Sequence, residues 1–132
     1  MKLIVPERGS AHVGRIWENA TNRHSSVALL AEARAALARA RRLARLTDDE
    51  HAAAVEALFA RWGEVEGLEL TESLAGRAGE LAATCALRGY EAIHLASAEA
   101  ILDDGDVLVV SDVRLAAAAA SIGIEALVPT EA

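Results

Sequence analysis

Hydrophobic residues recur along most of this chain at the spacing of one helix face. Such stripes predict six helices, which begin near residues 10, 25, 47, 71, 90 and 114. The clearest covers residues 90–102, where Ile93, Ala96 and Ile101 share one face, while Glu91 and His94 lie one above the other on another face. The pattern therefore predicts a mainly helical chain.

Two of the helix starts carry a chemical signal. Thr47, with Glu50 three residues later, forms the capping-box pattern, in which each side chain accepts a hydrogen bond from the other residue's backbone N–H. The helix that follows should run to about Trp62. Thr71 or Ser73 is suited to cap the next helix, because a hydroxyl at that position accepts from a free backbone N–H.

Short apolar or alternating runs predict three strands, at residues 67–71, 107–110 and 124–128. The second is a continuous apolar run typical of a buried parallel strand, and Ser111 and Asp112 follow at its carboxyl end, where open sheets bind ligands. From the first strand onward the order is strand, two helices, strand, helix, strand. That alternation predicts an α/β domain whose parallel sheet is covered on both faces.

Length and composition narrow the class of protein. A chain of 132 residues with 53% hydrophobic content suits a single domain over residues 1–132. The one cysteine, Cys85, excludes a disulfide within the monomer and favours a reducing, cytoplasmic setting. No apolar run approaches the roughly 20 residues of a membrane helix, and the N-terminus lacks the pattern of a signal peptide. We therefore expect a soluble intracellular protein.

The charge distribution is uneven. The net charge of −7 argues against indiscriminate binding of nucleic acid, yet five of the 13 basic residues fall between residues 34 and 45 with no acid among them. Arginines near a helix C-terminus complement its dipole and cover apolar neighbours. The same cluster also suits a polyanion or an acidic partner, and both interpretations stay open.

Three acids stand far apart in the sequence and each lies in apolar surroundings, where an unpaired charge is costly: Glu32, Glu91 and Asp112. Oxygen ligands of this kind suit Mg²⁺ or Mn²⁺, which orient a nucleophilic water and neutralise charge developing on a phosphate ester. Each acid also has a structural interpretation. Glu32 would be a solvated helix residue, Glu91 a partner of Arg88, and Asp112 the cap of the following helix.

The segments around these acids carry a family resemblance. AEARAALARA, LRGYEAIHLASA and VLVVSDVRLAAAA, in this order and at these spacings, closely resemble PIN-domain ribonuclease toxins of the VapC type. The resemblance covers nearly the whole chain, and its middle motif is the most specific. It implies a compact three-layer α/β/α fold around a central parallel sheet.

The resemblance also implies a function. Toxins of this type are metal-dependent endoribonucleases, so it implies an RNA substrate, a VapB-type antitoxin and a homodimer. Glu32, Glu91 and Asp112 correspond to the family's catalytic ligands for Mg²⁺ or Mn²⁺. The family usually has aspartate where Glu91 stands, so the longer side chain must reach the same metal or shift it.

Five further residues are candidates for supporting roles. Arg34, Arg41 and Arg45 would bind RNA phosphates. His94 and Ser111 would support the metal ligands without binding the metal, since an imidazole is not a natural ligand of Mg²⁺.

The start of the chain departs from the family pattern. The family opens with a central strand that ends in an aspartate, whereas MKLIVPERGS resembles the segment just beyond it. We therefore expect the first strand and one of four acids to be absent, through a start codon placed too late or through natural truncation. A site with three acids predicts impaired cleavage of RNA. The alternative function is a catalytically inactive PIN-like scaffold that binds an antitoxin or dimerises.

Two further expectations follow. Carboxylates that converge without a metal repel one another, so at least one of the three acids should have a raised pKa. Trp17 and Trp62 belong to an apolar surface larger than a domain without its first strand can bury, so a partner should cover part of it.

Overall fold

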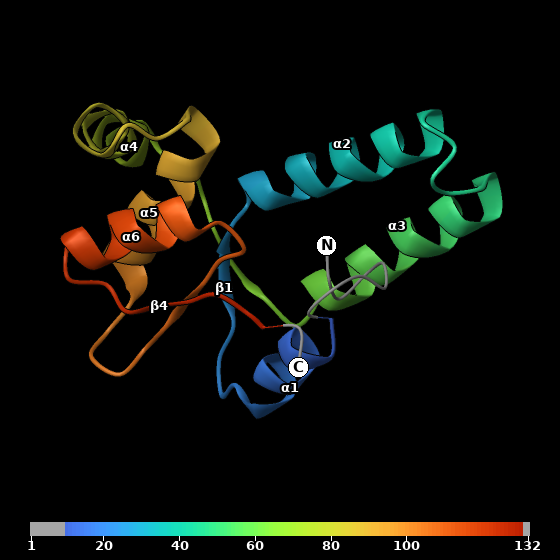
Figure 1. Cartoon of the computed structure of the whole chain (residues 1–132), viewed down its shortest axis with the longest axis horizontal. Coiled ribbons are helices and arrows are strands. Elements are labelled where there is room, and N and C mark those ends of the chain that lie inside the picture. The colour runs from blue at the N-terminus through green and yellow to red at the C-terminus, as the bar shows by residue number, and fades with distance from the viewer. Residues whose placement is uncertain (1–9, 131–132) are drawn as a thin grey trace. The chain divides into compact units, whose positions relative to one another are not determined.

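The computed structural model describes residues 10–130, and its secondary structure is mainly helical (Figure 1). The elements in chain order are α1 (Ser10–Asn19), β1 (His24–Ser26), α2 (Ala28–Arg42), α3 (Asp48–Trp62), β2 (Glu66–Leu68), α4 (Glu72–Cys85), α5 (Gly89–Ile101), β3 (Leu108–Val109), α6 (Val113–Ser121) and β4 (Ala126–Leu127). The six helices expected from the periodicity are all present. Residues 1–9 of the segment MKLIVPERGS, on which the expectation of a missing first strand rests, lie outside the described residues.

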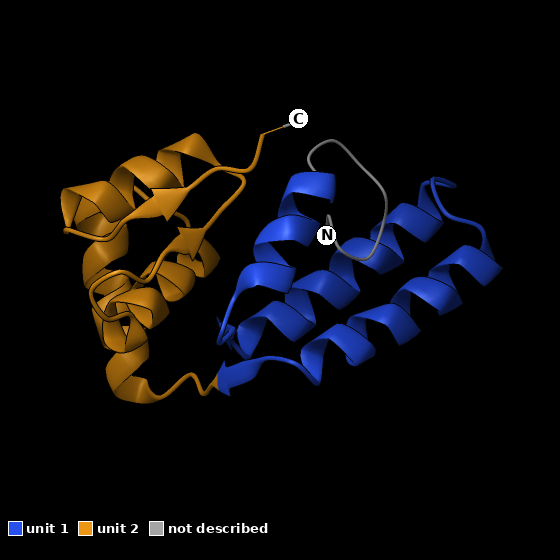
Figure 2. Ribbon diagram, turned by 90° about the horizontal axis from the view of Figure 1, so that it is seen from below, with its two compact units in different colours: residues 1–67, 131–132 blue, residues 68–130 orange. Residues whose placement is uncertain are grey.

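The chain divides into two compact units (Figure 2). Unit 1 runs to Gly67 and holds α1 to α3 with β1 and the first two residues of β2. Unit 2 covers Leu68–Thr130 and so begins at the last residue of β2. A single domain over residues 1–132 therefore stays a prediction. No helix within residues 10–130 is long and apolar enough to cross a membrane.

Unit 1 is built on the pair of helices α2 and α3, which bury Ala33 and Leu37 against Ala54 and Leu58. Helix α3 begins where the sequence predicts, because its capping box forms in both directions. The Thr47 hydroxyl accepts from the Glu50 backbone N–H at 3.1 Å, and the Glu50 carboxylate accepts from the Thr47 N–H at 2.9 Å.

The start of α2 differs from the prediction. Residues 25 and 26 were expected to open the helix, but they belong to strand β1, and the helix starts at Ala28. Ser26 stabilises the turn between β1 and α2, because its buried hydroxyl accepts a hydrogen bond from the Ala28 N–H at 3.2 Å. β1 pairs with β2, which spans residues 66–68 instead of the expected 67–71. Three polar residues give no alternation, so nothing in the sequence indicated β1.

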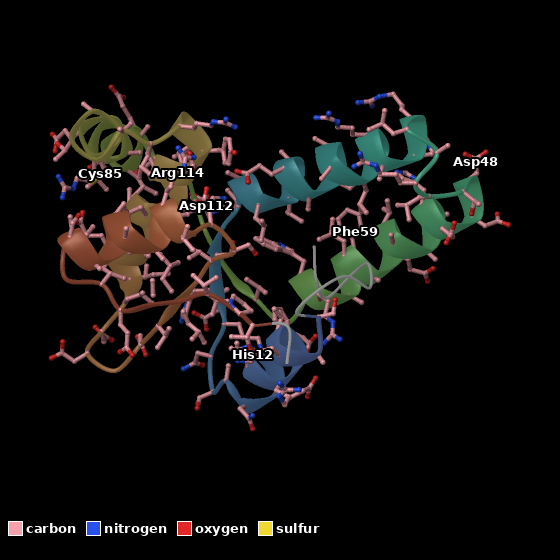
Figure 3. The ribbon with its side chains drawn as sticks, in the orientation of Figure 1. His12, Asp48, Phe59, Cys85, Asp112 and Arg114 are labelled. Atoms are coloured by element: carbon pink, nitrogen blue, oxygen red, sulfur yellow. The ribbon has the colours of Figure 1, made fainter. Side chains whose placement is uncertain are left out.

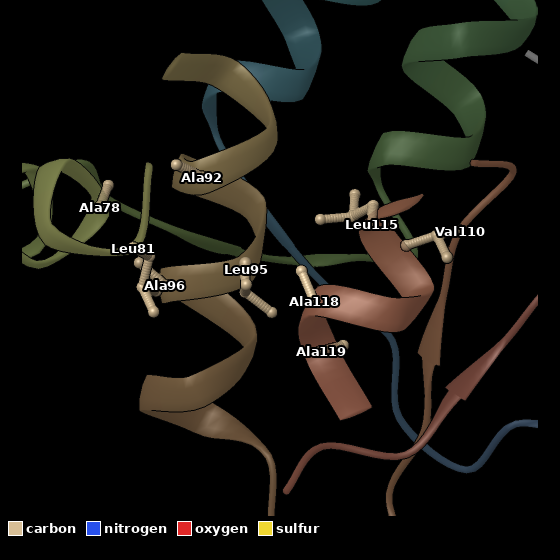
Figure 4. Close-up of a cluster of buried hydrophobic side chains, with 9 residues drawn as sticks. All are labelled: Ala78, Leu81, Ala92, Leu95, Ala96, Val110, Leu115, Ala118 and Ala119. Atoms are coloured by element: carbon tan, nitrogen blue, oxygen red, sulfur yellow. The ribbon is translucent and has the colours of Figure 1, made fainter. Parts of the chain in front are cut away.

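Unit 2 holds the larger core, which consists of small side chains from α4, α5 and α6 and one valine that follows β3 (Figure 4). Its buried members are Ala78, Leu81, Ala92, Leu95, Ala96, Val110, Leu115, Ala118 and Ala119. Alanine at these positions lets the helices approach closely, and Leu95 fills the space at the centre with 0% of its surface exposed.

The sheet of unit 2 has the predicted parallel direction. β3 pairs with β4 in the register Leu108 to Ala126 and Val109 to Leu127, and α6 forms the crossover between them. Val107 and Val109 are 38% and 40% exposed, whereas Val110 is buried, so one face of this strand is covered. The helices and the small parallel sheet agree with the α/β class.

The tryptophans are not the exposed apolar residues of the chain. Trp17 is half-buried between the guanidinium groups of Arg23 and Arg61, whose central carbons lie 4.9 Å and 5.5 Å from its ring. Trp62 is half-buried over Gly67, where an added Cβ would come within 3.0 Å of its ring. Side chains and backbone of unit 1 thus cover part of each tryptophan, and the expectation that a partner covers part of this apolar surface stays a prediction.

Candidate active site

Glu91 is a buried carboxylate at the N-terminus of a helix. It stands in the first turn of α5, and only 5% of its side chain is exposed. Its Oε1 accepts from the backbone N–H of Arg88, the N-cap residue, at 3.0 Å. The N-terminus of a helix favours a negative charge, so a carboxylate is suited to this position.

Asp112 comes three positions after the end of β3 and caps α6. Its Oδ1 accepts from the backbone N–H of Arg114 at 2.8 Å, and 42% of its side chain is exposed. The prediction that it caps the following helix is confirmed. Because Oδ1 makes the cap, Oδ2 is the oxygen that contacts other groups.

Arg114 joins the two acids. Its Nη2 lies 3.5 Å from the Oε2 of Glu91 and 3.5 Å from the Oδ2 of Asp112. Figure 3 labels Asp112 and Arg114 at the start of α6. Two carboxylates that are 21 positions apart in the chain therefore share one guanidinium nitrogen within unit 2. The structure brings this part of the predicted acidic set together.

The same arginine decides the protonation of Asp112. The backbone N–H of Arg114 and then its guanidinium charge hold the pKa of Asp112 below its usual range. At Asp112 the direction is opposite to the raised pKa expected from crowded carboxylates. The expectation of a raised pKa did not take account of the positive charge of Arg114, two positions after Asp112.

Glu32 lies on α2 in unit 1, where it is half-buried. Within residues 10–130, no three His, Cys, Asp or Glu side chains lie close enough together to hold a metal ion. The convergence of Glu32 with Glu91 and Asp112 therefore stays a prediction.

Comparison with known proteins gives the family. No protein-family model matches the chain. The chain is 40% identical over 123 residues to Ribonuclease VapC45 of Mycobacterium tuberculosis strain CDC 1551, a match that covers 93% of this chain and 85% of the relative. The identity and coverage are the same for Ribonuclease VapC49 of Mycobacterium tuberculosis strain H37Rv. The chain belongs to the VapC family. The resemblance seen in the three acidic segments is thereby confirmed.

The donor chemistry of Glu91 and Asp112 fits a hard divalent cation. Glu91 and Asp112 offer carboxylate oxygens only, and Mg²⁺ and Mn²⁺ prefer oxygen ligands. The nitrogen of Arg114 between them shows that a positive charge is held at this point. Glu91 and Asp112 are therefore the residues of unit 2 whose oxygens suit such a cation.

The other residues expected to act in a VapC-type site are placed as follows. Arg34, Arg41 and Arg45 are exposed in unit 1, on α2 and just after it, and the Arg34 guanidinium carbon lies 5.8 Å from the ring centre of Phe59. His94 is half-buried on α5, and Ser111 is exposed immediately before Asp112. Their roles stay predictions.

The residue that sequence reasoning missed is Arg114. Arg114 lies in the segment VLVVSDVRLAAAA, two positions after Asp112. Its position in the sequence predicted contacts only with residues close to it in the chain, and not with Glu91. A signal was present, since Arg114 stands two positions after Asp112 in the sequence and a nearby cation favours the charged form of a carboxyl group.

Proposed function

We propose that this chain is the toxin of a type II toxin–antitoxin pair and a metal-dependent endoribonuclease. The observation that carries the proposal is its 40% identity, over 93% of its length, to two proteins named as VapC ribonucleases. The contact of Glu91 and Asp112 with the same arginine also supports the proposal, because two neighbouring carboxylates can hold the metal ion that assists cleavage of a phosphodiester.

The residues would act as follows. Glu91, Asp112 and Glu32 would hold Mg²⁺ or Mn²⁺. Backbone hydrogen bonds orient two of these carboxylates, from the Arg88 N–H to Glu91 and from the Arg114 N–H to Asp112. When bound, the metal supplies a water nucleophile at neutral pH and neutralises charge on the phosphate. Arg34, Arg41 and Arg45 are exposed and can contact RNA phosphates without losing a buried partner.

The finer architecture belongs to the same proposal. The parallel pair β3 and β4 with its crossover helix supports a three-layer α/β/α PIN-like domain over residues 1–132. A VapB-type antitoxin and a second copy of the chain are the proposed partners. Exposed large hydrophobic residues support cover by a partner, with Phe59 at 51% and Leu43 at 49% exposed in unit 1 and Val113 at 69% in unit 2.

Cleavage of labelled RNA by the purified chain tests the activity. We expect cleavage with Mg²⁺ or Mn²⁺ and none with EDTA. Asp112→Asn should lower the rate by about a hundredfold, equivalent to about 2.7 kcal/mol of transition-state stabilisation. The matched control is Asp104→Asn, an exposed aspartate of the turn after α5 that should leave the rate unchanged.

The weak cleavage expected from a three-acid site is tested in parallel by a form extended with an upstream strand that ends in aspartate. Faster, Asp112-dependent cleavage by the extended form would support that expectation. If neither form cleaves RNA with any divalent metal, while the chain binds an antitoxin, the inactive scaffold becomes the better interpretation.

A further inference from the structure

Arg114 places a permanent positive charge where a metal would be held. Its Nη2 is 3.5 Å from one oxygen of Glu91 and 3.5 Å from one oxygen of Asp112. A divalent cation held by Glu91 and Asp112 would be bound by the same two carboxylates that Arg114 contacts. The guanidinium and the cation therefore compete for the same negative charge.

We infer that Arg114 is the built-in counter-ion of this site, which the divalent metal must displace and which thereby sets the metal affinity of the chain. The inference rests on the proposed function, since it assumes that Glu91 and Asp112 are metal ligands. It assigns a role to a residue that is neither a metal ligand nor one of the proposed RNA contacts.

Glu91 needs such a counter-ion. Only 5% of its side chain is exposed, and a buried carboxylate without a compensating charge is costly. The Arg88 N–H satisfies one of its oxygens, and Arg114 is the cation that faces the other. Exchange of Arg114 for a divalent cation would keep Glu91 compensated before and after metal binding.

Arg114 is also able to leave. Its side chain is 61% exposed, so most of it is already in water, and both of its contacts are at the outer limit of hydrogen-bond length. An exposed arginine loses little by moving into solvent, because its guanidinium remains hydrated. The Arg114 side chain can therefore leave the two carboxylates and return to them, because it is not held in the core.

Binding of Mn²⁺ alone, measured by calorimetry on the full chain, tests the inference. Arg114→Gln removes the competing charge and keeps the backbone N–H that caps α6 through Asp112. We expect it to bind Mn²⁺ about threefold to tenfold more tightly than the wild type. Arg114→Lys keeps the charge and should stay near the wild-type affinity. Arg39→Gln, which removes an equal charge from an exposed position of α2, is the matched control and should have no effect.

Thermal unfolding gives a second readout. Without metal, Arg114→Gln should unfold at a lower temperature than Arg39→Gln, because Glu91 has lost its counter-ion. Addition of Mn²⁺ should raise its unfolding temperature by more than it raises that of the wild type.

Asp112→Asn separates the two proposals. Wild-type binding of Mn²⁺ that is lost in Asp112→Asn, together with an unchanged or weaker affinity in Arg114→Gln, would overturn the role of Arg114 and leave the proposed metal site standing. Absence of any Asp112-dependent binding in the wild type would overturn both.

Discussion

Unit 1 and unit 2 use charged side chains in opposite ways. In unit 1 the five arginines of residues 34–45 are all exposed, and the core between α2 and α3 contains only alanine and leucine. In unit 2 a glutamate is 4% exposed and shares an arginine with an aspartate from another element. A fold gains little stability from a buried charge, so its presence in unit 2 marks that unit as the place where the chemistry is expected.

The two units also differ in the depth of their cores. The core of unit 1 has four buried residues from two helices, whereas that of unit 2 has nine from three helices and the segment after β3. A position surrounded on all sides relaxes less when a side chain is removed. The predictions that follow test this difference, from the largest expected effect to the smallest.

Core truncations should separate the units most clearly. Leu37 in unit 1 and Leu95 in unit 2 are both 0% exposed. We expect Leu95→Ala to lower the free energy of unfolding by about 4 kcal/mol and Leu37→Ala by about 2 to 3 kcal/mol, because the smaller core of unit 1 can collapse around the lost atoms. Leu43→Ala, at a residue that is 49% exposed, is the control and should cost under about 0.5 kcal/mol.

Denaturation with urea measures these free energies of unfolding, and tryptophan fluorescence shows which of them belong to unit 1. Both tryptophans of the chain, Trp17 and Trp62, lie in unit 1, so their fluorescence follows that unit while circular dichroism follows all helices. A larger loss in Leu37→Ala than in Leu95→Ala would contradict the comparison of the cores.

Helix caps should give smaller, graded effects. Thr47 makes a reciprocal capping box at the start of α3, and Thr71 makes a single bond to the Leu74 N–H at the start of α4. We expect Thr47→Ala to cost about 1 kcal/mol and Thr71→Ala about 0.5 kcal/mol in urea unfolding. Thr84→Ala, at an exposed position inside α4, is the control. Equal costs at the two caps would show that the second bond of the box adds nothing.

The ion pair between α4 and α5 should give a pH-dependent effect confined to acid. Arg77 donates two hydrogen bonds to Glu99, at 2.6 Å and 2.8 Å, and thereby lowers the pKa of Glu99. A lowered pKa means that the pair stabilises the fold above the ordinary value near 4.5 and loses this contribution as the pH falls through the lowered pKa. The stability difference between the wild type and Glu99→Gln should therefore be constant above about pH 5.5 and shrink below about pH 4.5.

The matching change in unit 1 is Glu64→Gln. Glu64 approaches Arg61 only at 3.8 Å, with neither side chain buried, so its loss should change stability little at any pH. A pH dependence as large as that of Glu99→Gln would remove this contrast between the units.

The smallest effect is a titration. NMR of the metal-free chain should place the pKa of Asp112 below its ordinary value of about 3.9, because the Arg114 N–H and guanidinium favour the ionised form. Arg114→Gln should move that pKa upward while the backbone hydrogen bond keeps part of the shift. An Asp112 pKa at or above the ordinary value in the wild type would contradict the shared arginine.

The sequence by itself determined the presence of all six helices and the starts of three of them. Helices α3, α4 and α5 begin within one residue of the positions predicted from Thr47, from Thr71 and from the apolar stripe that starts at residue 90, because capping and 3.6-residue periodicity act over a few neighbours. The parallel direction of β3 and β4 followed from the helix between them, since a single helical crossover brings two strands back in the same direction. Family membership was also readable from the three acidic segments.

Only the tertiary structure decided how Glu91 is compensated. Its spacing to Arg88 suggested a side-chain partner, but Arg88 supplies a backbone N–H and the cation comes from Arg114, 23 positions away. That contact exists because α5 and α6 pack in one core, and packing between elements distant in the chain leaves no periodic trace in the sequence. The strand β1 escaped prediction for the same reason, since its three polar residues become a strand only through pairing with β2.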